Sequence, residues 1–261
     1  MKHITSRDNA QYKDLKALAT SSQARRKAGR TLLDGVHLCE SWLQLRGLPE
    51  QCIVSDSGLL NPEIAALVRE LEAQHGHCLQ LPDALYEALS QVEHGVGMMF
   101  LVPTPERAAP AALSVNAVLL DNVQDPGNLG SILRSAAAAG ISQIFCSPGT
   151  AFCWSPKVLR AAMGAHFVLD IFENVPLAPL LQDAPIATLA TSGYAKQKLY
   201  DVDLKGPVAW VFGHEGQGVS DALLALARHR VVIPHLGQVE SLNVAACAAV
   251  CFFEQVRQNL A

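Results

Sequence analysis

Three short stretches of the sequence place polar residues where they could act on a ligand. The first, LDNVQDPGNLGSILRSA at residues 120–136, puts Asn128 at the expected cap of a helix that carries Arg134 almost two turns further on. A guanidinium that reaches back toward a helix N-terminus is electrostatically unfavourable there, so this spacing indicates an anionic partner. The alternative is an arginine on a solvent-facing side of the helix, which is its common place.

The second stretch, VFGHEGQGVS at residues 211–220, follows an apolar run and holds Gly213, Glu215, Gly216 and Gly218. Glycines let the backbone approach a ligand closely and adopt positive φ. A dinucleotide-binding fingerprint belongs at the first strand–helix turn, whereas this loop comes late and encloses an acidic residue. The alternative is a glycine-rich structural turn.

The third stretch, IPHLGQVESLNVAACAAVCFFE, turns at Gly237 and then sets Glu240, Ser241 and Asn243 at the start of the last helix, expected from about residue 239 to 259. A polar side chain that accepts hydrogen bonds from free backbone N–H groups is enough to cap a helix. Three polar residues exceed that need, which indicates a binding role besides capping.

Apolar runs alternate with amphipathic segments around these stretches. Strands are expected at NAVLLDN, SQIFCS, HFVLDIF, PIATLAT, GPVAWVFG and HRVVIP, with helices at NLGSILRSAAAAG, SPKVLRAAMGA, PLAPLLQD and SDALLALAR. Strands without polar alternation, separated by helices, predict a mostly parallel sheet covered on both faces. Each polar stretch follows a strand, and ligands gather at the carboxyl ends of strands in such sheets.

A second, smaller unit precedes this sheet. Residues 31–103 alternate strand-like and helix-like segments, which predicts a small α/β domain. The segment PTPERAAPAALS contains three prolines and no periodicity, which indicates a linker. We therefore expect an N-terminal domain at 1–103, a linker at 104–114 and a C-terminal domain at 115–261.

Residues 1–30 form a basic arm with eight Lys or Arg residues and two Asp residues. Such an arm can bind phosphates, although a solvated helix face explains the charge equally well. The net charge of the whole chain is −4, so global electrostatics give no signal for a nucleic-acid partner.

The composition bounds the class of protein. Half of the residues are hydrophobic, which supports a substantial folded core. No apolar run approaches the roughly 20 residues that span a bilayer, and we expect a cytoplasmic protein with no membrane association. The seven cysteines form no CxxC pair, so we expect reduced core thiols and no metal site.

Taken in order, the three stretches resemble the motifs of the SpoU, or TrmH, branch of the SPOUT RNA methyltransferases. The matching patterns are N-x-G-x-x-x-R, G-x-E-G-x-G and I-P-x-x-G-x-x-E-S-L-N-V-A-x-x-A, spread over about residues 115–258. His214 departs from the family pattern, in which Asn or Ser is frequent. The segments SRDNAQYKDLKAL and RTLLDGVHLCESW are similar to the RNA-binding domain of members that modify ribosomal RNA.

The resemblance implies a function and a fold. It implies 2′-O-methylation of a ribose in RNA with S-adenosylmethionine as co-substrate; the additional front domain favours ribosomal RNA, and transfer RNA is the alternative. It also implies a C-terminal α/β SPOUT domain with a parallel sheet and a deep trefoil knot, which works as a homodimer. The N-terminal domain is implied to be a smaller α/β RNA-binding domain.

Residue roles carry over by the same resemblance. The implied catalytic residues are Asn128, Arg134, Glu215, Ser241 and Asn243; the implied cofactor-binding residues are Thr191, Gly213, Ile233, Gly237 and Leu242; the candidates for RNA binding are Arg7, Lys13, Arg25, Arg26 and Arg30. The pKa of a guanidinium is about 12 or above, so the group stays protonated at neutral pH. We therefore expect Arg134 to bind the neighbouring phosphate and orient the hydroxyl, with the phosphate or water as proton acceptor.

Two other classes of protein fit parts of the sequence. A non-catalytic RNA-binding protein on the same fold is disfavoured because the polar residues of all three motifs are intact. A nucleotide-dependent oxidoreductase on an open α/β sheet is disfavoured by the late position of the glycine loop.

Overall fold

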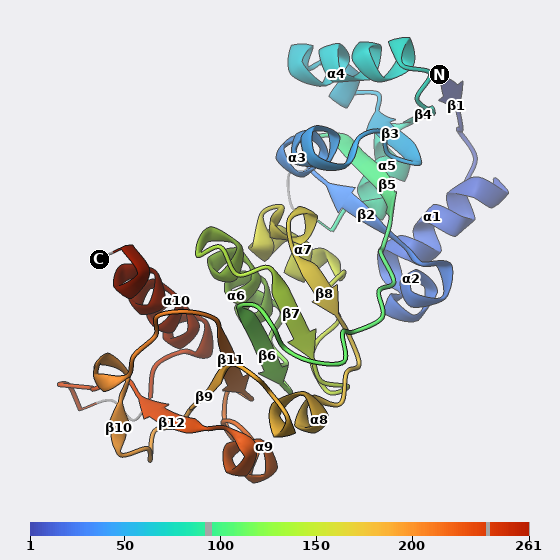
Figure 1. Ribbon diagram of the computed structural model, residues 1–261. Helices are drawn as coiled ribbons and strands as arrows, with labels where there is room; N and C mark the ends of the chain where they lie inside the picture. The colour runs from blue at the N-terminus through green and yellow to red at the C-terminus, as the bar shows by residue number, and fades with distance from the viewer. Residues whose placement is uncertain (92–95, 239–240, 261) are drawn as a thin grey trace. The chain divides into compact units, whose positions relative to one another are not determined.

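Two sheets organise the chain (Figure 1). The computed structural model describes residues 1–91, 96–238 and 241–260. The chain divides into unit 1, made of Met1–Glu106 and Trp154–Phe167, and unit 2, made of Arg107–Cys153 and Val168–Ala261.

Unit 1 is built on a mixed five-stranded sheet with the order β1-β4-β3-β5-β2, in which β5 runs antiparallel to both of its neighbours. Its strands are β1 (Lys2–His3), β2 (Arg30–Asp34), β3 (Gln51–Ser55), β4 (Cys78–Leu81) and β5 (Met98–Pro103). Its helices are α1 (Ala10–Thr20), α2 (Ser22–Ala28), α3 (Val36–Arg46), η1 (Gly58–Leu60), α4 (Pro62–Ala73), α5 (Asp83–Leu89), α7 (Pro156–Ala162) and η2 (Ala165–Phe167).

The basic arm at residues 1–30 folds mainly as the two helices α1 and α2. The Asn9 side chain caps α1 and the Ser21 side chain caps α2, each by accepting backbone N–H bonds. Gly29, at φ 60°, ends α2 in the left-handed conformation that glycine adopts without strain. Leu15 and neighbouring apolar residues of α1 are buried in the core of unit 1, so the arm is part of the folded domain.

The segment Trp154–Phe167 packs with unit 1 although it interrupts the sequence of unit 2. The Thr31 hydroxyl donates a hydrogen bond to the Trp154 carbonyl at 3.0 Å. The ring of Trp42 meets that of Phe167 edge-on at 5.3 Å. The sequence-based C-terminal domain at 115–261 is corrected at this segment, because its apolar side chains are buried among those of unit 1.

Unit 2 is built on a seven-stranded sheet with the order β10-β12-β9-β11-β6-β7-β8, and every neighbouring pair is parallel. Its strands are β6 (Ala117–Asp121), β7 (Gln143–Cys146), β8 (Asp170–Phe172), β9 (Ala187–Thr191), β10 (Gln197–Lys198), β11 (Val208–Gly213) and β12 (His229–Val232). Its helices are α6 (Pro126–Ala138), α8 (Leu177–Gln182), η3 (Leu199–Asp201), α9 (Asp221–Leu226) and α10 (Val244–Leu260). The predicted parallel sheet is confirmed.

Helices cover both faces of this sheet. Val211 packs into a cluster with Leu180 of α8 and Leu223 of α9. On the other face, the ring of Phe212 meets Phe252 of α10 edge-on at 5.6 Å. Successive residues of β11 therefore serve opposite faces, as the two-residue period of a strand requires.

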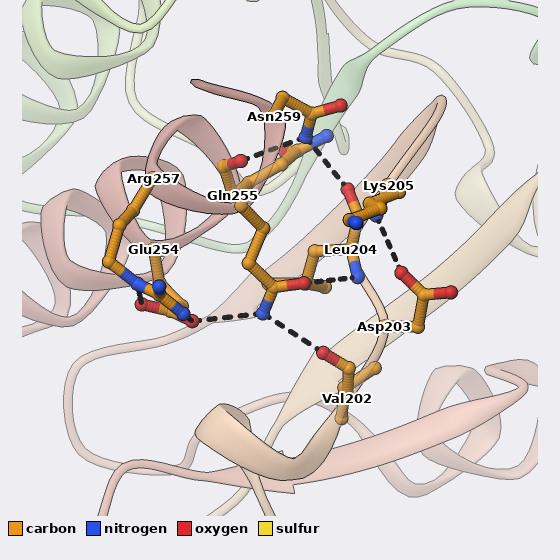
Figure 2. A network of polar contacts seen from close by, with 9 residues as sticks. Val202, Asp203, Leu204, Lys205, Glu254, Gln255, Arg257 and Asn259 are labelled. Carbon is orange, nitrogen blue, oxygen red and sulfur yellow. Dashed lines mark hydrogen bonds and ion pairs between the residues drawn. The ribbon is translucent and has the colours of Figure 1, made fainter. Parts of the chain in front are cut away.

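Side-chain amides fasten the C-terminal part of α10 to the segment Val202–Lys205 (Figure 2). Gln258 accepts a hydrogen bond from the Leu204 N–H at 2.9 Å and donates one to the Val202 carbonyl at 3.1 Å. Asn259 donates to the Leu204 carbonyl at 3.0 Å. Since α10 begins next to Asn243, these bonds help to fix the position of a candidate site residue at the other end of the helix.

The sequence pattern located the strands expected in unit 2, with three differences. HFVLDIF contributes only the short β8, because His166 and Phe167 belong to η2. The last helix begins at Val244 rather than near residue 239; residues 239 and 240 lie outside the described part of the chain. The short elements β10 and η3 were not expected.

Replacing Gln255 should destabilise unit 2. Its Oε1 accepts a hydrogen bond from the fully buried indole of Trp210 at 2.9 Å, and its Nε2 donates to Asn116 Oδ1 at 2.9 Å. Gln255→Ala leaves the indole N–H without this acceptor, which costs about 1–3 kcal/mol. Urea unfolding measures the loss, with Gln44→Ala on the exposed side of α3 as the control; equal stabilities of wild type and Gln255→Ala would contradict the assignment.

Candidate active site

The turn between β6 and α6 is set by an Asp-Pro pair. Asp125 Oδ1 accepts a hydrogen bond from the Asn128 N–H at 2.8 Å, and Pro126 occupies the first helical position. The expectation that Asn128 caps this helix is wrong, because Asp125 holds that place. The Asn128 side chain is thereby free to make contacts outside its own helix.

The Glu215 carboxylate, in the glycine loop after β11, binds this turn. It accepts hydrogen bonds from the backbone N–H groups of Gln124 at 3.2 Å and Asp125 at 3.0 Å, and from Asn128 Nδ2 at 3.1 Å. Hydrogen bonds to an ionised carboxylate are stronger than those between neutral groups. One side chain therefore joins the first polar stretch to the second.

Asn128 also forms a hydrogen bond with the third polar stretch. Its Oδ1 accepts a hydrogen bond from Asn243 Nδ2 at 2.8 Å. Asn243 Oδ1 in turn accepts from the N–H groups of Ala245 and Ala246, and so caps α10. The side chains of Glu215, Asn128 and Asn243 form a continuous chain of hydrogen bonds, which we call the carboxamide relay.

The glycine loop that carries Glu215 is tightly folded. A Cβ on Gly213 would lie 2.1 Å from the carbonyl atoms of Gly218, so only glycine fits there. Gly218 has φ 72° and donates its N–H to the His214 carbonyl at 2.8 Å. The His214 ring Nδ1 accepts from the Gly216 N–H at 3.0 Å, so the residue that departs from the family pattern stabilises the turn.

Hydrogen bonding keeps Glu215 ionised. Partial burial acts to raise the pKa of its carboxyl group, but the bonds from Asp125, Asn128 and Gln124 outweigh burial and hold the pKa below its ordinary value. The relay thus contains a fixed negative charge at neutral pH.

Two implied catalytic residues stay outside the relay. Arg134 is exposed, and it forms no hydrogen bond or ion pair with any described residue. It is six residues after Asn128, which corresponds to about 120° around the helix axis from that residue. Ser241 is likewise exposed just before α10. Glu240, the further polar residue of this stretch, lies outside the described residues.

The implied cofactor-binding residues gather at the ends of neighbouring strands. Thr191 ends β9, Gly213 ends β11 and Ile233 directly follows β12, and these three strands are adjacent in the sheet. Thr191 Oγ1 donates to the carbonyl of Val211 in β11 at 3.4 Å.

The loop after β12 offers a different surface from the relay. Gly237 is exposed, as are the apolar side chains of Leu236 and Leu242. Residues 234–238 form no backbone hydrogen bond with another described residue. This loop therefore presents free backbone groups and apolar side chains together, a combination that suits a planar heterocycle with hydrogen-bonding edges.

The candidates for RNA binding in unit 1 differ in their surroundings. Arg7 and Arg26 are exposed, Lys13 pairs with Asp8 at 3.1 Å, and Arg30 pairs with Glu50 at 3.3 Å. These four side chains remain candidates.

The structure removes Arg25 from the RNA-binding candidates, because its side chain is buried. It is 5% exposed, and its guanidinium donates to the carbonyls of Leu18 and Ala19 near the end of α1. Burial lowers the pKa of Arg25. Its role is to satisfy the last carbonyls of α1, because the chain turns sharply into α2 beside them.

An open cleft of about 990 Å³ lies beside α1 and α2 in unit 1. Its cationic lining comprises Lys2, Lys27 and Arg30, with Asp14 and Glu50 as its acidic residues. Leu15, Leu18 and Leu101 contribute apolar surface. The cleft is large enough for one nucleotide.

Sequence reasoning missed two contributors to the site. Asp125 was not singled out, although an Asp followed by Pro before a helix is a known start signal. Gln124 takes part only through its backbone N–H, which no residue type reveals. Within the described residues, no group of three or more His, Cys, Asp or Glu side chains could hold a metal ion. No described helix is long and apolar enough to cross a membrane.

Residues 116–253 match the model of the SpoU rRNA Methylase family. The 23S rRNA (guanosine(2553)-2′-O)-methyltransferase RlmP of Bacillus subtilis is 31% identical, covering 97% of this chain and 98% of that protein. An uncharacterised tRNA/rRNA methyltransferase of Synechocystis is 34% identical, with 99% of this chain and 94% of that protein covered.

The crystal structure of the SpoU methyltransferase AviRb from Streptomyces viridochromogenes, in complex with the cofactor AdoMet, is similar over nearly the whole length. The TM-score is 0.85 at 25% identity, and 97% of this chain and 99% of that chain are covered.

The lowered pKa of Glu215 predicts a pH dependence. A carboxyl whose pKa is depressed in the folded state contributes stability that is complete above its unfolded pKa of about 4.3 and is lost as the pH falls through the folded pKa. Glu215→Gln should therefore be less stable than wild type near pH 7. The difference in the free energy of unfolding between the two proteins should become smaller below about pH 4. Chemical unfolding over this range tests it, with Glu87→Gln on α5 as the control; a difference that stays constant down to about pH 3 would contradict it.

Proposed function

Because the chain belongs to the SpoU rRNA methylase family, we propose that it transfers a methyl group from S-adenosylmethionine to a ribose 2′-hydroxyl of RNA. The family match confirms the resemblance that the three motifs predict. The observation that carries the proposal is the relay, since it brings one residue from each motif into a single hydrogen-bonded chain. The family assignment excludes the alternative of a nucleotide-dependent oxidoreductase.

The donor is proposed to bind at the ends of β9, β11 and β12. S-adenosylmethionine supplies an electrophilic methyl group on a sulfonium. The exposed Leu236 and Leu242, together with the free backbone at 234–238, fit an adenine ring, which is apolar on its faces and forms hydrogen bonds along its edge. Thr191, Gly213, Ile233 and Gly237 would line this site from the strand ends. The related structure of AviRb with AdoMet supports the same donor.

The proposed mechanism relies on positioning. Methyl transfer from sulfur to oxygen requires the ribose oxygen in line with the methyl carbon, and such positioning accounts for several kcal/mol of a barrier. Glu215 holds Asn128, and Asn128 holds Asn243, so the amide groups of the relay are fixed before the substrate arrives. Preorganised groups of this kind need no rearrangement during the reaction.

Arg134 is proposed to bind the phosphate beside the target ribose. Its guanidinium is exposed and stays protonated at neutral pH, so it is suited to a bidentate phosphate contact and not to removal of a proton. The phosphate or a water molecule would accept the hydroxyl proton. Ser241, exposed before α10, is proposed to contact the same nucleotide.

Ribosomal RNA is the proposed substrate. RlmP, which this chain matches over nearly its whole length, is named for a guanosine of 23S rRNA, and this supports ribosomal over transfer RNA. We assign RNA binding by unit 1 to Arg7, Lys13, Arg26 and Arg30 and to the cleft that Lys2 and Lys27 line. A ribosomal substrate would place the protein in the cytoplasm.

A homodimer and a deep trefoil knot in unit 2 belong to the same proposal. In a single chain, Arg134 lies about 120° around α6 from Asn128 and has no described partner, so its guanidinium is available to a second copy. Phe253 of α10 is 49% exposed and Leu260 is 83% exposed, which provides apolar surface for that copy.

The proposed reaction is tested with the full chain, labelled S-adenosylmethionine and a 23S rRNA transcript. We expect label in 2′-O-methylated nucleosides after complete digestion. Arg134→Lys should lose at least about tenfold in kcat/KM, because an ammonium cannot replace the planar guanidinium, while its affinity for S-adenosylmethionine by calorimetry stays unchanged. Methyl groups on bases would overturn the proposal, and failure of wild type to bind the donor would favour a catalytically silent RNA-binding protein.

Complementation tests the shared site. Arg134→Ala and Asn128→Ala are each expected to be inactive as pure samples. If Arg134 acts in the partner's site, mixing and re-equilibrating the two variants should restore part of the activity, since mixed dimers contain one site with both residues intact. A mixture that stays as inactive as the separate variants would place Arg134 in the site of its own subunit, and a monomeric mass in light scattering would contradict the dimer.

A further inference from the structure

One tyrosine on the edge of unit 2, Tyr194, forms no side-chain hydrogen bond or ring contact with any residue that the structure describes. Residues 192–198, which comprise the turn after β9 and the short strand β10 and which we call the β9–β10 loop, have the sequence SGYAKQK. Tyr194 in this loop has a relative exposure of 100%. Lys196 and Lys198 are exposed beside it, and no acidic residue occurs between Thr191 and Tyr200.

The loop holds Tyr194 on an ordered turn. The Ser192 hydroxyl accepts a hydrogen bond from the Tyr194 N–H at 3.3 Å, and the Ser192 carbonyl accepts one from the Ala195 N–H at 3.2 Å. The Ser192 N–H donates to the Val231 carbonyl of β12 at 3.0 Å. Lys198 at the far end pairs with β12. Both ends of the loop are therefore tied to the sheet, and the ring stands out between them.

The β9–β10 loop begins at the carboxyl ends of the strands, where the relay also lies. β9, which ends at Thr191, lies next to β11, and β11 lies next to β6. All three are parallel, so their carboxyl ends face one way. At a strand spacing of about 4.8 Å, the ends of β9 and β6 are about 10 Å apart. The base of the loop therefore lies one strand from the end of β11 and two strands from the end of β6, between which the candidate active site forms.

The chemistry of the loop suits single-stranded RNA. Aromatic side chains interleaved with lysines bind such strands, because bases stack on the rings and ammonium groups contact the phosphates. A protein gains nothing in stability from an aromatic ring fully in water. We propose that Tyr194 is a stacking platform for a base that neighbours the target nucleotide, with Lys196 and Lys198 on its phosphates; this inference rests on the proposed function.

The test measures RNA binding directly, without methyl transfer. The probe is a fluorescein-labelled, mixed-sequence oligoribonucleotide of about 20 nucleotides, and the protein is the full chain. Tyr194→Ala should weaken binding by about tenfold, whereas Tyr194→Phe keeps the ring and should bind within about twofold of wild type. Tyr200→Ala, an exposed tyrosine beyond the loop, is the matched control and should bind like wild type.

The lysines give a second, independent readout. Replacing both Lys196 and Lys198 by Gln should weaken RNA binding. It should also make the slope of log affinity against log salt less negative by about 1–2, since about two phosphate contacts are lost. With a 23S rRNA transcript, Tyr194→Ala should raise KM by about tenfold with kcat within about threefold of wild type.

Three results would overturn the proposal. The first is unchanged RNA affinity in Tyr194→Ala. The second is a loss of affinity of Tyr194→Ala for S-adenosylmethionine in calorimetry, which would make Tyr194 part of the donor site. The third is a molar mass of Tyr194→Ala in light scattering that differs from that of wild type, which would make Tyr194 a contact between copies of the chain. If wild type binds RNA through Tyr194 but transfers no methyl group, the proposed function fails and the platform stands.

Discussion

The arrangement of unit 2 around its site depends on the carboxylate of Glu215. This side chain receives two backbone N–H groups from the turn before α6 and the amide of Asn128, and so joins the ends of β11 and β6. The loop that carries it folds tightly because Gly213 has no Cβ that would meet Gly218. An ionised group with this many donors orders its surroundings more strongly than a neutral one.

The remainder of unit 2 supports this interaction from a distance. The parallel sheet sets the ends of β6, β9, β11 and β12 side by side. Helix α10 is held at one end by Asn243 in the relay and at the other by Gln258 and Asn259 on the segment Val202–Lys205. Because a helix is stiff, bonds near its last turn restrict where its first turn can lie. The site thus draws on contacts that never touch a substrate.

The sequence predicted most strands and the three polar stretches, because periodicity and glycine spacing are local properties. It did not predict which side chain caps α6: Asp125 and Asn128 are both capping residues, and the structure has Asp125 as the cap while Asn128 binds Glu215, 87 residues away. It did not predict the burial of Arg25, whose charge suggests exposure until the two carbonyls it binds are known. The packing of residues 154–167 with unit 1 depends on Trp42 and Phe167, which are far apart in sequence.

The central claim is that Glu215, Asn128 and Asn243 act as one unit in methyl transfer. A double-mutant cycle on kcat with Glu215→Gln and Asn243→Ala tests it most directly, since these two residues share Asn128 as partner. If the relay is one unit, the double variant should lose about as much kcat as the more damaging single variant. If the two losses multiply, Glu215 and Asn243 act independently and the account is contradicted.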